Sequence, residues 1–116
     1  MKKRTVVGCL VTLSLLLSSC GTTKLYNWAH YEDISYAYSK KHSPEAEAKL
    51  AETYQMLIDS QNVGRKTVPP GICAEYGFLL VKQGKKDQGI ALLEKEIALY
   101  PESEKFIGRI IKQLQK

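Results

Sequence analysis

The chain has 116 residues, which is the length of a single domain. Hydrophobic residues make up 44% and charged residues 25% of the sequence, a balance that excludes an intrinsically disordered chain. The formal net charge of +5 falls further once Lys2, Lys3 and Arg4 are set aside, because the acidic and basic residues that remain are interleaved and nearly equal in number. A nucleic-acid-binding protein is therefore not expected.

Residues 1–19 have the pattern of an export signal. Three basic residues precede a short apolar run from Val6 to Leu17, and small residues follow it. A membrane-spanning helix needs about 20 apolar residues, so this run is too short for one. We expect the segment to be removed from the mature protein.

The end of this segment, Leu17-Ser18-Ser19-Cys20, resembles the lipobox of bacterial lipoproteins. That resemblance implies acylation of the Cys20 thiol, cleavage before it, and attachment to the membrane. Because Gly21 follows and not Asp, it also implies an outer membrane location with the domain in the periplasm, and exposure at the cell surface is the open alternative. We expect residues 20–24 to be a short lipid-attached tether and residues 25–116 to form the domain.

Aromatic residues are dense just after the tether, where Tyr26, Trp28 and Tyr31 lie close together. Tyr31, Ile34 and Tyr38 recur at helical spacing, which favours a core stripe. A membrane-interface or binding role remains open for Trp28 and Tyr31, because Tyr and Trp favour such surfaces.

A helix start is encoded at Ser43-Pro44-Glu45. Serine is a preferred N-cap, proline fits the first helical position, and an acidic residue complements the helix dipole. The helix that follows places four apolar residues on one face, namely Leu50, Tyr54, Leu57 and Ile58.

The stretch from Pro69 to Ser103 predicts a helical hairpin. Gly77 and Gly89 lack side chains where two antiparallel helices would cross, and Gly84 permits the turn between them. The facing apolar stripes are expected to hold Tyr76 and Leu80 on one helix and Ile90, Leu93, Ile97 and Tyr100 on the other. With Pro70, Gly77, Gly84, Gly89, Leu93 and Pro101 at the corresponding positions, the stretch resembles a tetratricopeptide repeat over its roughly 34 residues.

A last helix is predicted after Pro101, with an apolar stripe that covers the repeat. Its members are Phe106, Ile107, Ile110, Ile111 and Leu114. The basic residues on its other face leave a membrane-surface role as the alternative. The expected fold is all-α, with about five helices in tetratricopeptide-like antiparallel hairpins, one clear repeat and degenerate flanking units.

The chain as a whole resembles a group of small lipoproteins of Gram-negative bacteria whose function is unknown. The resemblance rests on the lipobox, on Leu25-Tyr26-x-Trp28-x-x-Tyr31-Glu32, on Pro69-Pro70-Gly71 and on Tyr100-Pro101-Glu102-Ser103. It implies gene-cluster neighbours that include a curli-pore-type lipoprotein, and so a shared envelope assembly.

Glu96 departs from the repeat, which normally has alanine at that position. A carboxylate on a largely apolar flank must be paired or must lie at an edge that a partner covers. Structural pairing with a hydroxyl, a backbone amide or a basic side chain is one interpretation, and a role in binding is the other.

No convergent catalytic set is evident, so an enzyme, a cofactor and a metal are not expected. His30 and His42 lack metal-ligand spacing, and Cys73 lies among apolar residues, which is typical of a buried thiol. The sequence favours a non-catalytic adaptor that binds a protein partner in the envelope, such as another lipoprotein. The alternative is a structural subunit of an outer-membrane lipoprotein assembly that associates through uncovered end faces.

Overall fold

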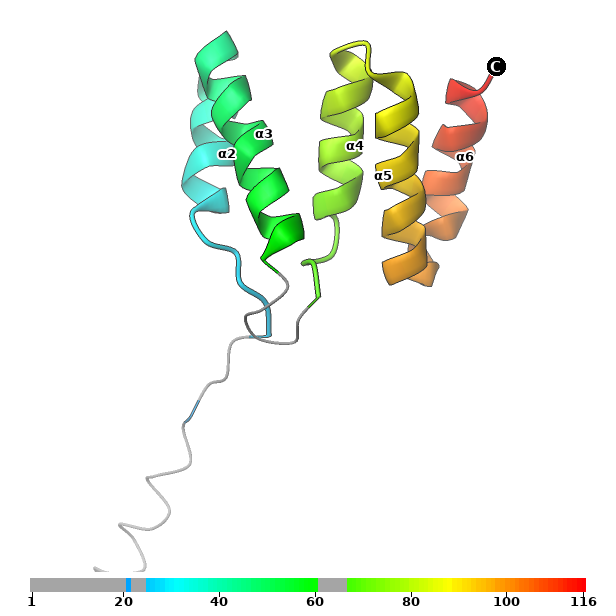
Figure 1. Ribbon diagram of the computed structural model, residues 1–116, viewed down its shortest axis with the longest axis horizontal. Coiled ribbons are helices and arrows are strands. Elements are labelled where there is room, and N and C mark those ends of the chain that lie inside the picture. The colour runs from blue at the N-terminus through cyan, green and yellow to red at the C-terminus, as the bar shows by residue number, and fades with distance from the viewer. Residues whose placement is uncertain (1–20, 22–24, 61–66) are drawn as a thin grey trace, which may run out of the picture.

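The computed structural model of the chain describes residues 21, 25–60 and 67–116 (Figure 1). The proposed signal segment, Cys20 and most of the tether lie outside the described residues. The described part contains five α-helices and one short 3-10 helix, and it contains no strand. The helices are α2 (Tyr31–Lys40), α3 (Pro44–Asp59), α4 (Ile72–Lys82), α5 (Lys86–Leu99) and α6 (Glu104–Leu114), with the 3-10 helix η1 (Pro101–Ser103) before α6. The all-α prediction is confirmed.

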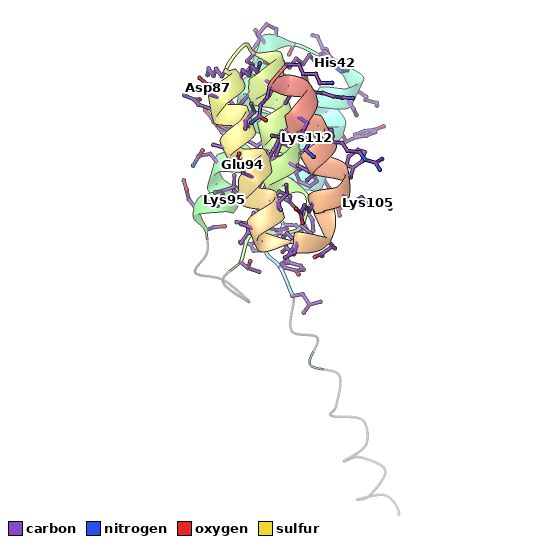
Figure 2. The ribbon with its side chains drawn as sticks, turned by 90° about the vertical axis from the view of Figure 1, so that its right-hand side faces the viewer. His42, Asp87, Glu94, Lys95, Lys105 and Lys112 are labelled. Carbon is purple, nitrogen blue, oxygen red and sulfur yellow. The ribbon has the colours of Figure 1, made fainter. Side chains whose placement is uncertain are left out.

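Successive helices run in opposite directions and stand in one row (Figure 1). The helices α2, α4 and α6 therefore share one direction, and residues 25–30 lie on the side where these three helices begin. Viewed along the row, α3 and α5 lie toward one side and α2 and α6 toward the other (Figure 2).

The start of α3 is capped as the sequence predicts. Ser43 has extended backbone angles, and its hydroxyl oxygen accepts a hydrogen bond from the Ala46 backbone N–H at 3.2 Å. Pro44 occupies the first helical position. The predicted face of α3 is buried. Thr53, which was not predicted, is buried beside it, and its hydroxyl donates to the Lys49 carbonyl at 2.8 Å.

The crossing of α4 and α5 depends on two glycines. A Cβ atom built on Gly77 would lie 2.8 Å from the Gly89 carbonyl oxygen, and one built on Gly89 would lie 2.6 Å from the Gly77 carbonyl oxygen. The two backbones are thus in direct contact, because no side chain separates them. Gly84 has φ +82° in the turn between the helices. The predicted roles of these three glycines are confirmed.

Two apolar clusters form the core. The first lies among α2, α3 and α4 and contains Leu50, Tyr54, Leu57, Ile58, Val68, Ile72, Cys73 and Leu79, with Tyr31, Ile34 and Tyr38 packed against it. The second joins α4, α5 and α6 and contains Ala74, Leu93, Ile107 and Ile111. Leu93 and Cys73 are fully buried. The stripe expected on α2 packs against the first cluster, with its residues partly buried.

The stripes predicted for the hairpin need correction. Tyr76 packs toward α3, where its ring stacks on Tyr54 with centroids 5.6 Å apart. Ile90 and Ile97 pack against the cluster that α6 completes. The reason is that α4 and α5 each have neighbours on two sides, so their apolar residues divide between the hairpin partner and the next helix in the row.

Candidate binding face

Glu96 pairs with the backbone at the start of α4. It is 3% exposed; Oε1 accepts a hydrogen bond from the Gly71 N–H at 2.7 Å, and Oε2 accepts one from the Ala74 N–H at 3.3 Å. Gly71 is the N-cap residue and has no side chain to cap the helix, so the carboxylate from α5 takes that place. A negative charge also complements the positive end of the α4 dipole. This explains the departure from the alanine of the repeat.

Tyr100 makes a second connection between the end of α5 and the start of α4. Its hydroxyl donates to the Val68 carbonyl at 2.7 Å, which ties the end of α5 to the segment before α4. Pro101 follows and begins η1, so the direction of the chain changes there before α6. Pro70 lies exposed just before α4.

Glu75 joins three helices through two tyrosines. Its Oε2 accepts hydrogen bonds from the Tyr31 hydroxyl at 2.5 Å and from the Tyr54 hydroxyl at 2.8 Å. Burial and this carboxylate raise the pKa of Tyr31 to about 12, and the same two causes raise the pKa of Tyr54. The sequence analysis missed Glu75, since its partners lie 44 and 21 residues away along the chain.

Trp28 lies at the outer part of a row of aromatic rings. Ring centroids are 5.8 Å apart between Trp28 and Tyr31, and 6.0 Å apart between Tyr31 and Tyr54. Tyr26 contacts the other side of Trp28, with the ring centroids 6.4 Å apart. Trp28 remains 38% exposed, so it is both packed on the domain and accessible from outside.

A second polar network joins α2, α3 and α4 at the end away from Glu75. The Tyr38 hydroxyl donates to Glu47 Oε2 at 3.3 Å, and Lys82 Nζ donates to the Tyr38 hydroxyl at 3.1 Å. Gln83 Nε2 donates to Glu47 Oε1 at 2.8 Å. The three helices are therefore joined by polar contacts at both ends, with Glu75 at one and Glu47 at the other.

Two grooves lie on the side formed by α2, α4 and α6, which we call the front face. The first groove lies between α2 and α4 and has a volume of about 350 Å³; Tyr31, Ser35, Tyr38, Glu75, Phe78 and Lys82 are among its lining residues. The second lies between α4 and α6 and has a volume of about 450 Å³; Ala74, Phe78, Glu96, Glu102, Phe106 and Ile107 are among its lining residues. Phe78 lines both grooves, so it is a ridge between them.

The exposure of Phe106 corrects the sequence prediction. Ile107 and Ile111 of the predicted stripe are buried, and Ile110 and Leu114 pack against the same cluster, so α6 covers the repeat. Phe106, however, is 68% exposed, and Phe78 on α4 is 40% exposed. The apolar arc of α6 is wider than the surface it covers, and the remaining part faces the second groove.

A family profile described as a domain of unknown function (DUF4810) matches residues 25–110. The chain belongs to this family. The match includes Trp28, Tyr31, Glu75, Glu96 and the lining residues of both grooves, so the front face lies within the family's shared region. The expected relationship to a family of unknown function is confirmed, whereas the predicted lipobox precedes the matched residues. Neither the comparison with curated proteins nor the comparison with solved structures found a match.

Two further features of this family member concern chemistry and membranes. Burial and the nearby Glu96 raise the pKa of the Cys73 thiol to about 11, as expected of a buried cysteine and not of a nucleophile. No group of three potential metal ligands converges within the described ranges. No helix in the same part of the chain is long and apolar enough to cross a membrane.

Proposed function

We propose that the chain is a lipid-anchored, non-catalytic protein-binding module of the bacterial cell envelope. It is attached to the outer membrane through acylated Cys20 and presents the front face to a protein partner in the periplasm. The observation that carries the proposal is the pair Phe78 and Phe106, which stand exposed on either side of an apolar groove of about 450 Å³.

The energetic argument concerns these two side chains. Burying one phenylalanine stabilises a protein or a complex by roughly 1.5–3 kcal/mol. Because the Phe106 side chain is mostly exposed in the folded chain, a partner that covers it would gain most of this free energy. Aromatic residues that flank a groove are typical anchors of protein interfaces. The groove floor is formed by Ala74 and Ile107, which are buried, so a partner side chain would meet a packed apolar surface.

The scaffold beneath the groove suits a preorganised site. Gly77 and Gly89 hold α4 against α5, and Glu96 fixes the start of α4. A partner that binds such a surface loses little free energy in ordering it, which favours affinity.

The alternative, a structural subunit that stacks through its end faces, predicts an apolar outer side on the last helix. The last helix, α6, carries the exposed residues Lys105, Arg109 and Lys112, and polar end helices are typical of capped repeat arrays. These charges support an adaptor over a stacking subunit.

Site-specific photocrosslinking in cells that express the full-length chain tests the binding face. A photoreactive residue at position 106 should crosslink to a discrete partner, whereas the same residue at position 94 on α5 should not, because Glu94 is exposed away from the front face (Figure 2). Equal crosslinking at the two positions, or none at position 106, would contradict the proposal.

The lipid anchor has a separate test. Replacing Cys20 with Ser removes the thiol that is acylated, so metabolic labelling with a fatty acid and sedimentation with the membrane fraction should both be lost. A single acyl chain gives marginal binding and two or three give a stable anchor. Membrane association that persists in the Cys20→Ser variant would show that another part of the chain attaches it.

A further inference from the structure

The three helices of the front face carry the same charge pattern. Each begins with acidic residues in its first turn, which are Glu32 and Asp33 in α2, Glu75 in α4 and Glu104 in α6. Each ends with a lysine in its last turn, which is Lys40 in α2, Lys82 in α4 and Lys112 in α6. The helices α3 and α5 have no basic residue in their last turns. The repeated pattern is therefore confined to the helices that form the grooves.

Because α2, α4 and α6 run in one direction, the acidic first turns lie at one end of these three helices and the lysines of the last turns lie at the other end (Figure 1). The grooves carry the same polarity, since Glu75 and Lys82 lie along the first groove and Glu102 lines the second near the start of α6. Along the grooves, the front face thus has the acidic residues Glu75 and Glu102 toward the start of α4, the apolar side chain of Phe78 in the middle of α4, and Lys82 at the end of α4.

An amphipathic α-helix matches this surface in one orientation. Helices favour acidic residues in the first turn and basic residues in the last, because these charges complement the helix dipole. A helix that lies antiparallel to α4 would place its acidic first turn beside Lys82 and its basic last turn beside Glu75 and Glu102. Its apolar side chains would fall on both sides of the Phe78 ridge, as ridges fit grooves in helix packing.

We propose that the occupant of the front face is an amphipathic helix of another protein, antiparallel to α4, with its acidic start near Lys82 and its basic end near Glu102. This inference rests on the proposed function and adds the chemistry and direction of the partner. A second copy fits less well, because two chains anchored at the same end would stand parallel and bring like charges together. An anionic lipid surface would meet the acidic end unfavourably.

Two synthetic peptides provide the probe. The forward peptide has a leucine stripe, acidic residues in its first turn and lysines in its last turn, and the reversed peptide has the same composition with the charged turns exchanged. Binding to the full-length chain in lipid nanodiscs is measured by fluorescence anisotropy, with empty nanodiscs as the blank. We expect the forward peptide to bind at least about fivefold more tightly than the reversed peptide at low salt. The reason is that several pairs of opposite charge at the edge of the interface contribute together.

A charge-exchanged protein supplies the matched control. The double variant Lys82→Glu with Glu102→Lys should prefer the reversed peptide, and circular dichroism checks that it folds. Should it not fold, Glu102→Lys alone, at an exposed position, should weaken the forward peptide and not the reversed one. Phe78→Ala should weaken both peptides.

The outcomes separate the two proposals. Equal binding of the two peptides, or forward binding that survives Phe78→Ala, overturns the inferred direction and site. Absence of binding by either peptide, together with a crosslink from position 106, overturns the helical partner while the proposed function stands. Absence of both overturns the proposed function itself.

Discussion

Glu96 of α5 closes the amino-terminal end of α4 by accepting the Gly71 N–H at 2.7 Å. A helix terminus is usually capped by a side chain of its own segment, whereas here the cap comes from the other helix of the hairpin. The hydrogen bond therefore couples the formation of α4 to the docking of α5. Because the carboxylate is buried, its removal leaves backbone amides without a partner.

We predict that Glu96→Ala lowers the free energy of unfolding by roughly 2–3 kcal/mol, since hydrogen bonds to a charged group contribute about 1.5–3 kcal/mol. Glu96→Gln should lose less, because the amide oxygen still accepts one of the two bonds. Urea unfolding followed by circular dichroism measures both. Glu94→Ala, at an exposed position of the same helix, is the control, and an equal loss there would argue against the capping role.

The helix crossing predicts a contrast among glycines. Gly89→Ala should destabilise the fold by about 1–3 kcal/mol, because the new Cβ would lie 2.6 Å from the Gly77 carbonyl oxygen and 2.5 Å from Val81 Cγ2. Gly108→Ala, where nothing lies within 4 Å, should instead stabilise α6 by up to about 1 kcal/mol. Thermal unfolding of the two variants measures the difference, and effects of the same sign would contradict the close crossing.

Substitutions at the adjacent residues Phe106 and Ile107 of α6 should distinguish an effect on partner binding from an effect on stability. Phe106→Ala should change stability by less than about 0.5 kcal/mol, because the side chain is 68% exposed, and should weaken partner crosslinking. Ile107→Ala should lower stability by about 2–5 kcal/mol, since this residue is 4% exposed in the core. A strong loss of stability in Phe106→Ala would mean that its ring belongs to the core.

Stability should fall at alkaline pH because of the tyrosines that contact Glu75. A tyrosine whose folded-state pKa lies above its unfolded value of about 10 keeps its proton more firmly in the folded state. Its contribution is complete below about pH 10 and is lost as pH rises toward the folded-state pKa of about 12 at Tyr31. Urea unfolding at stepped pH values should show this slope reduced in Tyr31→Phe and unchanged in Tyr36→Phe, whose ring is 61% exposed.

Local features of the fold could be predicted because their causes are local. The Ser43 cap, the turn at Gly84 and the contact of Gly77 with Gly89 each follow from a residue type at a fixed spacing. The side on which Tyr76 packs could not be predicted in this way. Periodicity identifies an apolar face but does not say which of two neighbouring helices will cover it.

The candidate site was only partly predictable for a related reason. Glu96 stood out because it replaces a small residue, although its partner at Gly71 lies 25 residues earlier. Glu75 gave no such signal, since an acidic residue in the first turn of a helix is ordinary. Phe106 was misplaced because an exposed aromatic residue beside Ile107 has the same spacing as a core residue.

The row of helices has a consequence for how the chain folds and opens. Extensive contacts join only helices that follow one another along the described chain: α2 with α3, α3 with α4, α4 with α5, and α5 with α6. Such local topology favours rapid folding and lets the row open stepwise from its ends. Amide exchange should therefore be slowest in α4 and α5 and faster in α2 and α6, so the front face would be widened or narrowed by its two outer helices while α4 stays in place.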